Sequence, residues 1–315
     1  MRVAFGRPFL IVESQIMKFL TLVAVLFALP AHALEIQQVT DNVYAIVGPL
    51  EQRSTENLAN NATFGVVVTA EGVVLIDTGG SWNGAEEVHN AVREITDQPV
   101  KIVINSGGQD HRWIGNDYWQ QQGAEVIASA AAVADHKDRG SVQMTGLSVL
   151  LGDALEGTVP AYADTVFETG YSFELGGISF EITHAGQAHT PGDSFIWVPS
   201  EKTVFSGDIV YIERIIGVGE QSHSGSWIEV FETMAALNPA HIVPGHGDVT
   251  TLERATADTY DYLVNLRTQM GAFIDEGGDI IDSVNVDQAA WSYLENFEGL
   301  AKRNAQQVFS EMEWE

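Results

Sequence analysis

The sequence contains no cysteine among its 315 residues. This excludes disulfides, thiolate metal ligands and a cysteine nucleophile, so packing alone must hold the fold together. Any metal site must be built from histidine and carboxylate side chains. Such ligands suit zinc, iron or manganese.

Basic residues are also scarce, with 15 Lys and Arg against 43 Asp and Glu, which gives a formal net charge of −28. Nucleic acids and anionic membrane surfaces are bound through basic patches, so neither is expected as a partner. The charge is typical of a secreted or salt-adapted surface. We expect a small-molecule substrate as the partner, and the sequence leaves the oligomeric state open.

Long apolar runs are missing except near the start, where residues 17–33 resemble a signal peptide. Lys18 gives a basic start, the apolar stretch is short for a membrane span, and Ala31-His32-Ala33 is a small-x-small cleavage site. A membrane anchor is the alternative interpretation. We predict an upstream extension over residues 1–16, a signal peptide over 17–33, and a periplasmic or secreted mature protein that is not attached to a membrane.

The remaining chain alternates strand-like and helical patterns. Strands are predicted at residues 43–47, 64–69, 73–76, 100–104, 125–128, 171–175, 178–182, 194–198, 203–205 and 242–243. Residues 137–165 show no strong period and are predicted to be an excursion, either a lid or an active-site wall. Two strand-rich halves, each closed by helices, predict a single domain over residues 34–315. Its fold class is α/β, a four-layer αββα sandwich, with a helical tail over about 252–315.

Three short motifs carry candidate metal ligands at the ends of apolar segments. They contain His189, Asp208 and His246, each in a glycine-bearing loop. The gaps between them are too long for one helix face and suit separate loops at one rim of a sheet. A hydrolytic metal ion needs three or four such ligands and an open position for water. The motifs therefore predict a metal-dependent hydrolase.

In this order the motifs resemble the second half of the metallo-β-lactamase superfamily, over roughly residues 40–250. The resemblance implies that His189 is the third histidine of the first metal site. It also implies that Asp208 is the bridging aspartate and that His246 is the last histidine of the second site. Asp77, in an Asp-Thr-Gly turn, would support the ligand loop by hydrogen bonds.

The first half departs from the family motif Asn-Thr-His-x-His-x-Asp-His. Residues 105–116 read NSGGQDHRWIGN, and two alignments remain open. One matches Asp110-His111 to the final Asp-His and puts Ser106 and Gly108 at the early histidines. The other has no gap. It puts Gly107 and Gln109 at the early histidines, His111 at the aspartate and Arg112 at the last histidine.

Both alignments lose the His-x-His pair and retain His111. We therefore expect one ion, most simply zinc, with iron or manganese as alternatives. The predicted ligands are His111, His189, Asp208 and His246, with Asp110 or Gln109 in reserve. In the ungapped alignment, Arg112 would repel a second metal ion or bind an anionic group of the substrate.

The expected reaction is attack of activated water on an ester, thioester or amide-like bond. Asp208 would orient the water, His189 or Tyr211 would stabilise the oxyanion, and His223 would contact the substrate from a polar loop. His89 and His136 are predicted to be surface residues. The chain also resembles exported hydrolase-like proteins associated with quinoprotein systems, through residues 186–193 and more weakly 302–313.

Two other functions remain open. A catalytically inactive binding or accessory protein would explain the missing His-x-His pair. A β-lactamase-like or glyoxalase II-like activity would need cations for substrate carboxylates. Beyond Asp208, however, Ile209-Val210-Tyr211 follows, and the nearest cation is Arg214.

Overall fold

The structure is a computed structural model that describes residues 1–3, 6 and 34–315. The chain divides into two units, Met1–Ala31 and His32–Glu315, and every element below belongs to the second. The predicted signal peptide, and most of the extension before it, lie outside the described residues. Within the described part of the chain, no helix has the length and apolar character needed to cross a bilayer.

The first sheet has seven strands in the order β1 to β7. Strands β1 to β4 pair antiparallel, and β4 to β7 pair parallel. Both β4 and most of β5 are apolar because helices and the second sheet cover their two faces. The bounds are β1 Glu35–Gln38, β2 Val43–Val47, β3 Thr63–Thr69, β4 Gly72–Ile76, β5 Val100–Ile104, β6 Glu125–Ser129 and β7 Thr165–Phe167.

The second sheet has five strands in the order β12-β11-β10-β9-β8. Its strands pair antiparallel except β11 and β12, which run parallel. Of the predicted ligands, Asp208 lies within β11 and His246 ends β12. The bounds are β8 Gly170–Leu175, β9 Ile178–Thr183, β10 Phe195–Val198, β11 Thr203–Tyr211 and β12 His241–His246.

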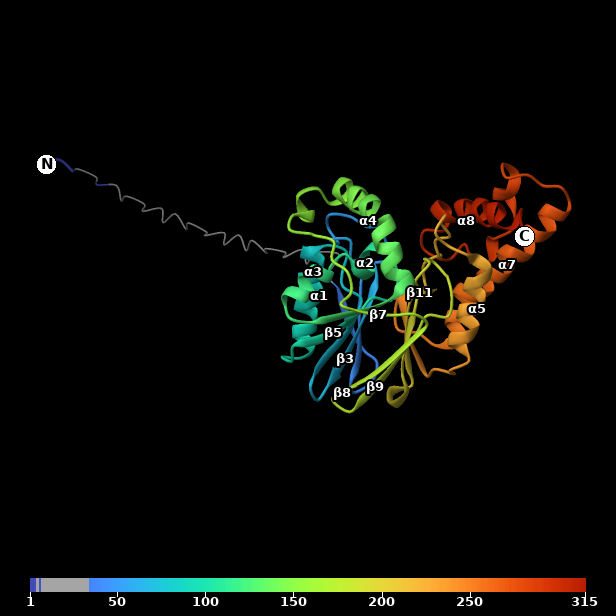
Figure 1. The fold of residues 1–315 in the computed structure, drawn as a ribbon. Coiled ribbons are helices and arrows are strands. Elements are labelled where there is room, and N and C mark those ends of the chain that lie inside the picture. The colour runs from blue at the N-terminus through green and yellow to red at the C-terminus, as the bar shows by residue number, and fades with distance from the viewer. Residues whose placement is uncertain (4–5, 7–33) are drawn as a thin grey trace. The chain divides into compact units, whose positions relative to one another are not determined.

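Apolar side chains from both sheets meet in one core, and helices cover the outer faces (Figure 1). At Gly65 in β3, an added Cβ would lie 2.2 Å from the Phe205 ring, so the sheets are in close contact. The helices are α1 Trp82–Ile95, α2 Asp110–Trp113, α3 Asn116–Gln121, α4 Ala130–Leu151, α5 Ser224–Ala235, α6 Leu252–Ala255, α7 Asp261–Asp275 and α8 Phe297–Met312. The predicted αββα sandwich is confirmed.

The expectation of an irregular excursion over residues 137–165 is wrong for its first half. Helix α4 runs to Leu151, and the Ser129 hydroxyl accepts a hydrogen bond from the Ala132 N–H at its start. The helix contacts the rest of the protein along a narrow face, and Val142 and Val149 are exposed. Its apolar residues therefore show little of the helical period on which sequence reasoning depends.

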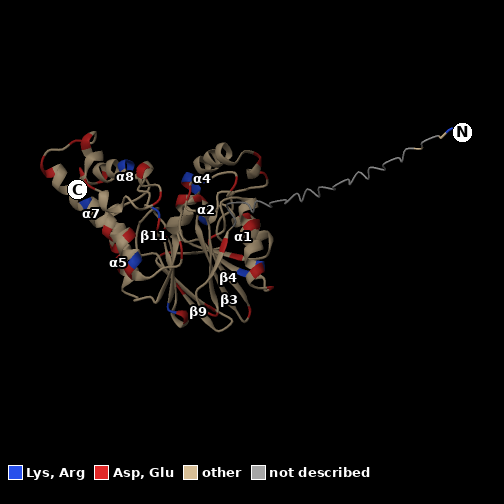
Figure 2. Ribbon diagram, turned by 180° about the vertical axis from the view of Figure 1, so that it is seen from behind, with Lys and Arg blue, Asp and Glu red and all other residues tan. Residues whose placement is uncertain are grey.

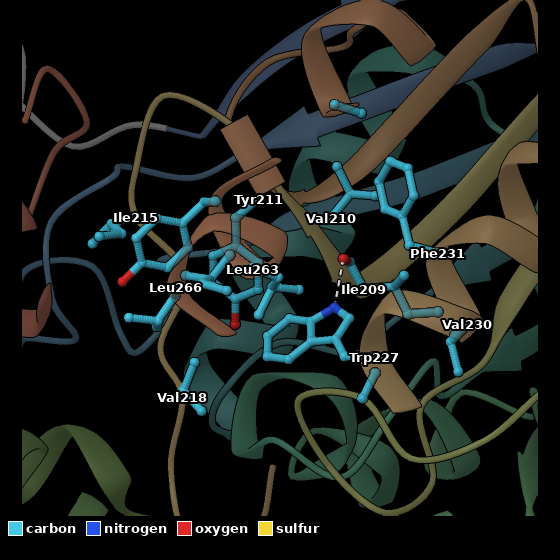
Figure 3. Packing of buried hydrophobic residues seen from close by; sticks show 14 of the residues in the cluster. Ile209, Val210, Tyr211, Ile215, Val218, Trp227, Val230, Phe231, Leu263 and Leu266 are labelled. Carbon is cyan, nitrogen blue, oxygen red and sulfur yellow. Dashed lines mark hydrogen bonds between the residues drawn. The ribbon is translucent and has the colours of Figure 1, made fainter. Parts of the chain in front are cut away.

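A second apolar cluster joins the end of β11 to α5, α7 and α8. Figure 3 shows its residues from β11, α5 and α7. Within it, the Trp227 indole N–H donates to the Ile209 carbonyl oxygen at 2.9 Å, beside Val210, Leu263 and Leu266. A buried indole N–H needs such a partner. The contact holds the end of β11, where Asp208 and Tyr211 lie, against the helical layer.

Candidate metal centre

Three of the predicted ligands converge. One ligand atom from each of His111, Asp208 and His246 lies within 4.8 Å of the others, and all three residues are buried. His111 Nε2 is 3.6 Å from Asp208 Oδ2, and His246 Nε2 is 3.2 Å from Asp208 Oδ1. We call these three residues the ligand cluster.

Different elements bring the ligand cluster together. His111 lies on the short helix α2 that follows β5, and His246 ends β12. Asp208 lies within β11 where the pairing with β12 is irregular, between Gly207 and Tyr211. Gly207 has φ of +49°, and a Cβ there would lie 2.2 Å from Ser106 Oγ. The glycine thus allows β11 to approach the loop that carries His111.

Arg112 lies behind the ligand cluster and is fully buried. Its Nε and one Nη donate to the two oxygens of Asp208 at 3.2 and 2.8 Å, and its other Nη donates to Asp77 at 2.8 Å. The remaining N–H groups donate to the carbonyl oxygens of Thr63 and Gly245 at 3.2 and 2.8 Å. All five N–H groups therefore have protein partners, and none is left for a substrate anion.

The guanidinium fixes the charge of Asp208. Burial alone would raise the pKa of this carboxyl. Arg112, together with the imidazoles of His111 and His246, instead holds that pKa well below its usual range. Asp208 is thus ionised and acceptor-only, and each oxygen that accepts from Arg112 retains lone pairs for an ion.

Asp77 makes hydrogen bonds to the loop before His111 and to Arg112. It has φ of +69°, and its Oδ1 accepts from the Ser106 N–H at 2.8 Å. Its Oδ2 accepts from the Ser106 hydroxyl and from Arg112, both at 2.8 Å. Removal of this carboxylate would leave Arg112 and the loop without their common partner.

The segment before His111, Gly107-Gly108, leaves no room for side chains. A Cβ at Gly107 would lie 2.2 Å from Asp193 Oδ1, and one at Gly108 would lie 1.8 Å from Asp135 Oδ2. Asp193 is held in turn, because its Oδ2 accepts from the Thr190 N–H at 2.7 Å. We call Gly107 and Gly108 the glycine segment. Its packing is incompatible with a side chain at either position unless the buried neighbours move.

His189 lines the same pocket as His111 and His246 but is not part of the ligand cluster. Its Nδ1 lies 2.8 Å from the Gly217 carbonyl oxygen, which can only accept, so this nitrogen carries the proton. Burial lowers the pKa of His189 to about 4, so the ring is neutral near pH 7. Nε2 is then an acceptor.

Tyr211 also lines the pocket, and its ring stacks on His246 with centroids 4.4 Å apart. Burial, followed by the charge of Asp208, raises the pKa of the Tyr211 hydroxyl well above its usual value. The hydroxyl keeps its proton near neutral pH and can donate a hydrogen bond.

The two reserve ligands lie beside the ligand cluster. Asp110 forms an ion pair with Arg53, and its Oδ1 accepts from the His111 N–H at 2.8 Å. Burial would raise its pKa, but Arg53 and His111 lower it below the usual range. Gln109 lines the pocket next to Arg53. Neither residue is in the ligand cluster.

Two further histidines, His223 and His136, make contacts away from the ligand cluster. His223 begins α5 as its cap, with Nδ1 accepting from the Ser226 N–H at 3.1 Å, and it does not line the pocket. The structure therefore gives no support to the expected substrate contact. The expectation that His136 is at the surface is wrong. It is fully buried, stacks on Trp113 and lies 3.0 Å from the Gly107 carbonyl oxygen.

The residues present fit a metal ion. Both ring nitrogens of His111 are buried and make no hydrogen bond within the described residues; their nearest carboxylate contacts are the longer ones to Asp110 at 3.4 Å and Asp208 at 3.6 Å. Such an arrangement is costly unless a ligand completes the site. Two imidazoles and an ionised carboxylate form a donor set typical of catalytic zinc. Arg112 and Asp77 supply the supporting contacts that such ligands need.

Sequence reasoning did not single out Arg53 or Arg303 as functional residues, yet both line the pocket with Arg214. The only available signal for Arg303 was the spacing of Leu300, Arg303 and Asn304, which places them on one helix face. No sequence signal shows which way that face points.

Comparisons with known proteins agree with this architecture. A family model described as the metallo-beta-lactamase superfamily matches residues 59–246. A metallo-beta-lactamase type 2 of Elizabethkingia meningoseptica is 25% identical over 221 residues, which cover 68% of this chain and 79% of that protein. One from Bacteroides fragilis is 22% identical over 219 residues, which cover 68% and 80%.

Solved structures share the fold at low sequence identity. The metallo-beta-lactamase from Pontibacter korlensis superposes with a TM-score of 0.59 at 21% identity, covering 74% of this chain and 99% of that chain. A variant of the sec-alkyl sulfatase PisA1 gives a TM-score of 0.69 at 14% identity, covering 88% of this chain and 50% of that chain. Since the family match spans more than half of the residues, the chain belongs to the metallo-β-lactamase superfamily.

Proposed function

We propose that the protein is a hydrolase that uses a single metal ion, most simply zinc, held by His111, Asp208 and His246. The observation that carries this proposal is the convergence of three buried ligand atoms within 4.8 Å beside a pocket that His111 and His246 line, where neither ring nitrogen of His111 makes a hydrogen bond to the part of the chain that the structure describes. When bound, the ion would act as a Lewis acid and lower the pKa of a water molecule.

The side chains around the ligand cluster would orient Asp208, accept a proton and stabilise the oxyanion. Arg112 holds both oxygens of Asp208 and so fixes the direction of its free lone pairs. His189, whose Nδ1–H is held by the Gly217 carbonyl oxygen, presents Nε2 to accept a proton from the attacking water. Tyr211 keeps its hydroxyl proton and can donate to the oxyanion that develops at the scissile carbonyl.

The glycine segment supports the choice of a single ion. A histidine at Gly107 would place its Cβ against the buried Asp193. His189 alone cannot replace a set of three ligands. We propose for the same reason that His189 acts in proton transfer rather than as a ligand, which revises the expectation of four ligands.

The test is metal content together with turnover in two histidine variants. Purified protein is expected to contain one tightly bound ion per chain. His111→Ala should lose most of that metal. His189→Ala should keep the metal while turnover falls by roughly 10²–10⁴-fold, the usual range for loss of a general base. Elemental analysis gives the first result, and a panel of ester, thioester, lactam and alkyl sulfate substrates gives the second.

Several outcomes would contradict the proposal. Two tightly bound ions per chain would rule out a single-ion centre. Hydrolysis that is indifferent to chelation would rule out a role for the metal. A metal-loaded protein that turns over no substrate of the panel would favour the inactive binding protein.

A further inference from the structure

The pocket beside the ligand cluster has a charge opposite to that of the molecule. It has a volume of about 350 Å³, and Arg53, Arg214 and Arg303 line it. Among the described lining residues, Glu220 is the only carboxylate. The chain has only 15 Lys and Arg, and acidic residues occur along α1, α5 and α7 (Figure 2). Three arginines in one pocket therefore indicate a local preference for anions.

Arg214 is a buried cation that forms no ion pair with any of the described residues. It is 6% exposed, and its Nε has no hydrogen-bond partner within the described residues. Its Nη1 lies 3.4 Å from His246 Nδ1, which is a long hydrogen bond to a group that is not a carboxylate. A guanidinium removed from water without a carboxylate partner is costly unless a bound anion completes it.

Arg303 approaches the same pocket from α8. Its side chain takes part in none of the ion pairs found among the described residues, and Leu300 and Asn304 line the pocket beside it. Asn304 fixes α8 in place, because its Nδ2 donates to the Ile216 carbonyl oxygen at 2.9 Å and its Oδ1 accepts from the Val218 N–H at 2.9 Å. Helix α8 lies beyond residue 246, where the family match ends.

Arg53 has a different place in the pocket. It is already paired with Asp110, and its side chain is 25% exposed. Its charge is balanced within the protein, so Arg214 and Arg303 are the cations left to bind a ligand.

We propose that Arg214 and Arg303 form an anion subsite beside the ligand cluster, so that the substrate carries an oxyanion group such as a carboxylate or a sulfate. This inference rests on the proposed function for the identity of the pocket as a substrate site. Planar guanidinium groups bind such oxyanions through paired N–H donors. Helix α8 lies outside the region that matches the family model. A preference for anions that depends on Arg303 would therefore come from the chain's own C-terminal helix rather than from the matched region.

The subsite can be tested without turnover. Chelated, metal-free protein is titrated with sodium sulfate and, separately, with sodium acetate at constant ionic strength, and binding is followed by calorimetry. The two anions distinguish a sulfate-type from a carboxylate-type ligand. Saturable binding of one of them is expected. Because no metal is present, this result does not depend on whether the single-ion mechanism is correct.

The variants include a matched control. Arg303→Gln should weaken anion binding by roughly 2–5-fold, as expected for an exposed charge pair. Arg214→Gln should weaken it by roughly 10–100-fold, since a charge-assisted hydrogen bond at a buried site is stronger. Lys302→Gln removes the same charge from the next residue on α8, which does not line the pocket, and should leave binding unchanged.

Three results would overturn the subsite. These are no saturable binding of either anion, equal weakening by Lys302→Gln and Arg303→Gln, or wild-type binding in both arginine variants. If Arg214→Gln does not fold, Arg214→Lys replaces it. Lysine keeps the charge but loses the paired donors, so binding at the wild-type level in Arg214→Lys and Arg303→Gln would also overturn the proposal.

Discussion

His111 of the ligand cluster lies three residues after the glycine segment, yet the two are built in opposite ways. At His111 the chain presents a buried ring whose two nitrogens make no hydrogen bond among the residues that the structure describes. At Gly107 and Gly108 it packs its bare backbone against Asp193 and Asp135. One end of the loop is thus prepared for a ligand, and the other is filled by the protein itself. A short stretch of chain can retain one half of a binding site while its packing closes the other.

Arg112 is the residue on which the ligand cluster depends most. Arg112→Met would leave Asp77 and Asp208 buried without their common cation, so the free energy of unfolding should fall by about 3–5 kcal/mol. Urea denaturation of the chelated protein measures this loss. Arg267→Met is the control, because its side chain is 19% exposed and its partner Glu315 is at the surface, so its loss should be smaller, about 1 kcal/mol. Equal losses in the two variants would show that Arg112 contributes no more to stability than a partly exposed arginine does.

Gly107→Ala tests whether the glycine segment is closed by packing. The added methyl group would meet the carboxylate of Asp193, so we expect a loss of about 1–3 kcal/mol in the free energy of unfolding. Gly146→Ala on α4 meets no atom within 4 Å and should be neutral or stabilising, because alanine favours a helix. If Gly107→Ala is tolerated as well as the control, the loop can relax. Packing at the glycine segment would then not explain why the chain lacks the His-x-His pair.

His136 should make the packing around the glycine segment sensitive to acid. Burial lowers its pKa to about 4, below the usual 6.5, so the folded state resists the proton that the unfolded state takes up. The free energy of unfolding is therefore unaffected by the titration of His136 above about pH 6.5. It decreases as the pH falls from 6.5 toward 4, because protonation of His136 then favours the unfolded state. Between pH 7 and 5.5 the wild type should lose about 1 kcal/mol more than His136→Gln. Urea denaturation at the two pH values measures this difference. Equal losses in the free energy of unfolding for the wild type and His136→Gln would contradict the prediction.

Some of this protein could be predicted from local pattern alone. Apolar strands and the glycine turns after them indicated the αββα sandwich and three of the ligand candidates, because strand period and turn chemistry are local properties. Helix α4 was missed because most of its surface is exposed and it lacks an apolar stripe. His136 was placed at the surface for a related reason. Only the position of Trp113 shows that its ring is buried.

The sequence by itself determined the family, the absence of thiol ligands and the candidate ligands His111, Asp208 and His246. Only the tertiary structure decided which of the candidates converge, since ligands from β11, β12 and α2 meet through contacts between two sheets. It also decided that Arg112 binds Asp208 and Asp77 rather than a substrate, and that Arg303 reaches the pocket. Residue type and charge can be read directly from the sequence. The partner of a buried guanidinium cannot, because it comes from residues that are far away in sequence and meet only in the folded protein.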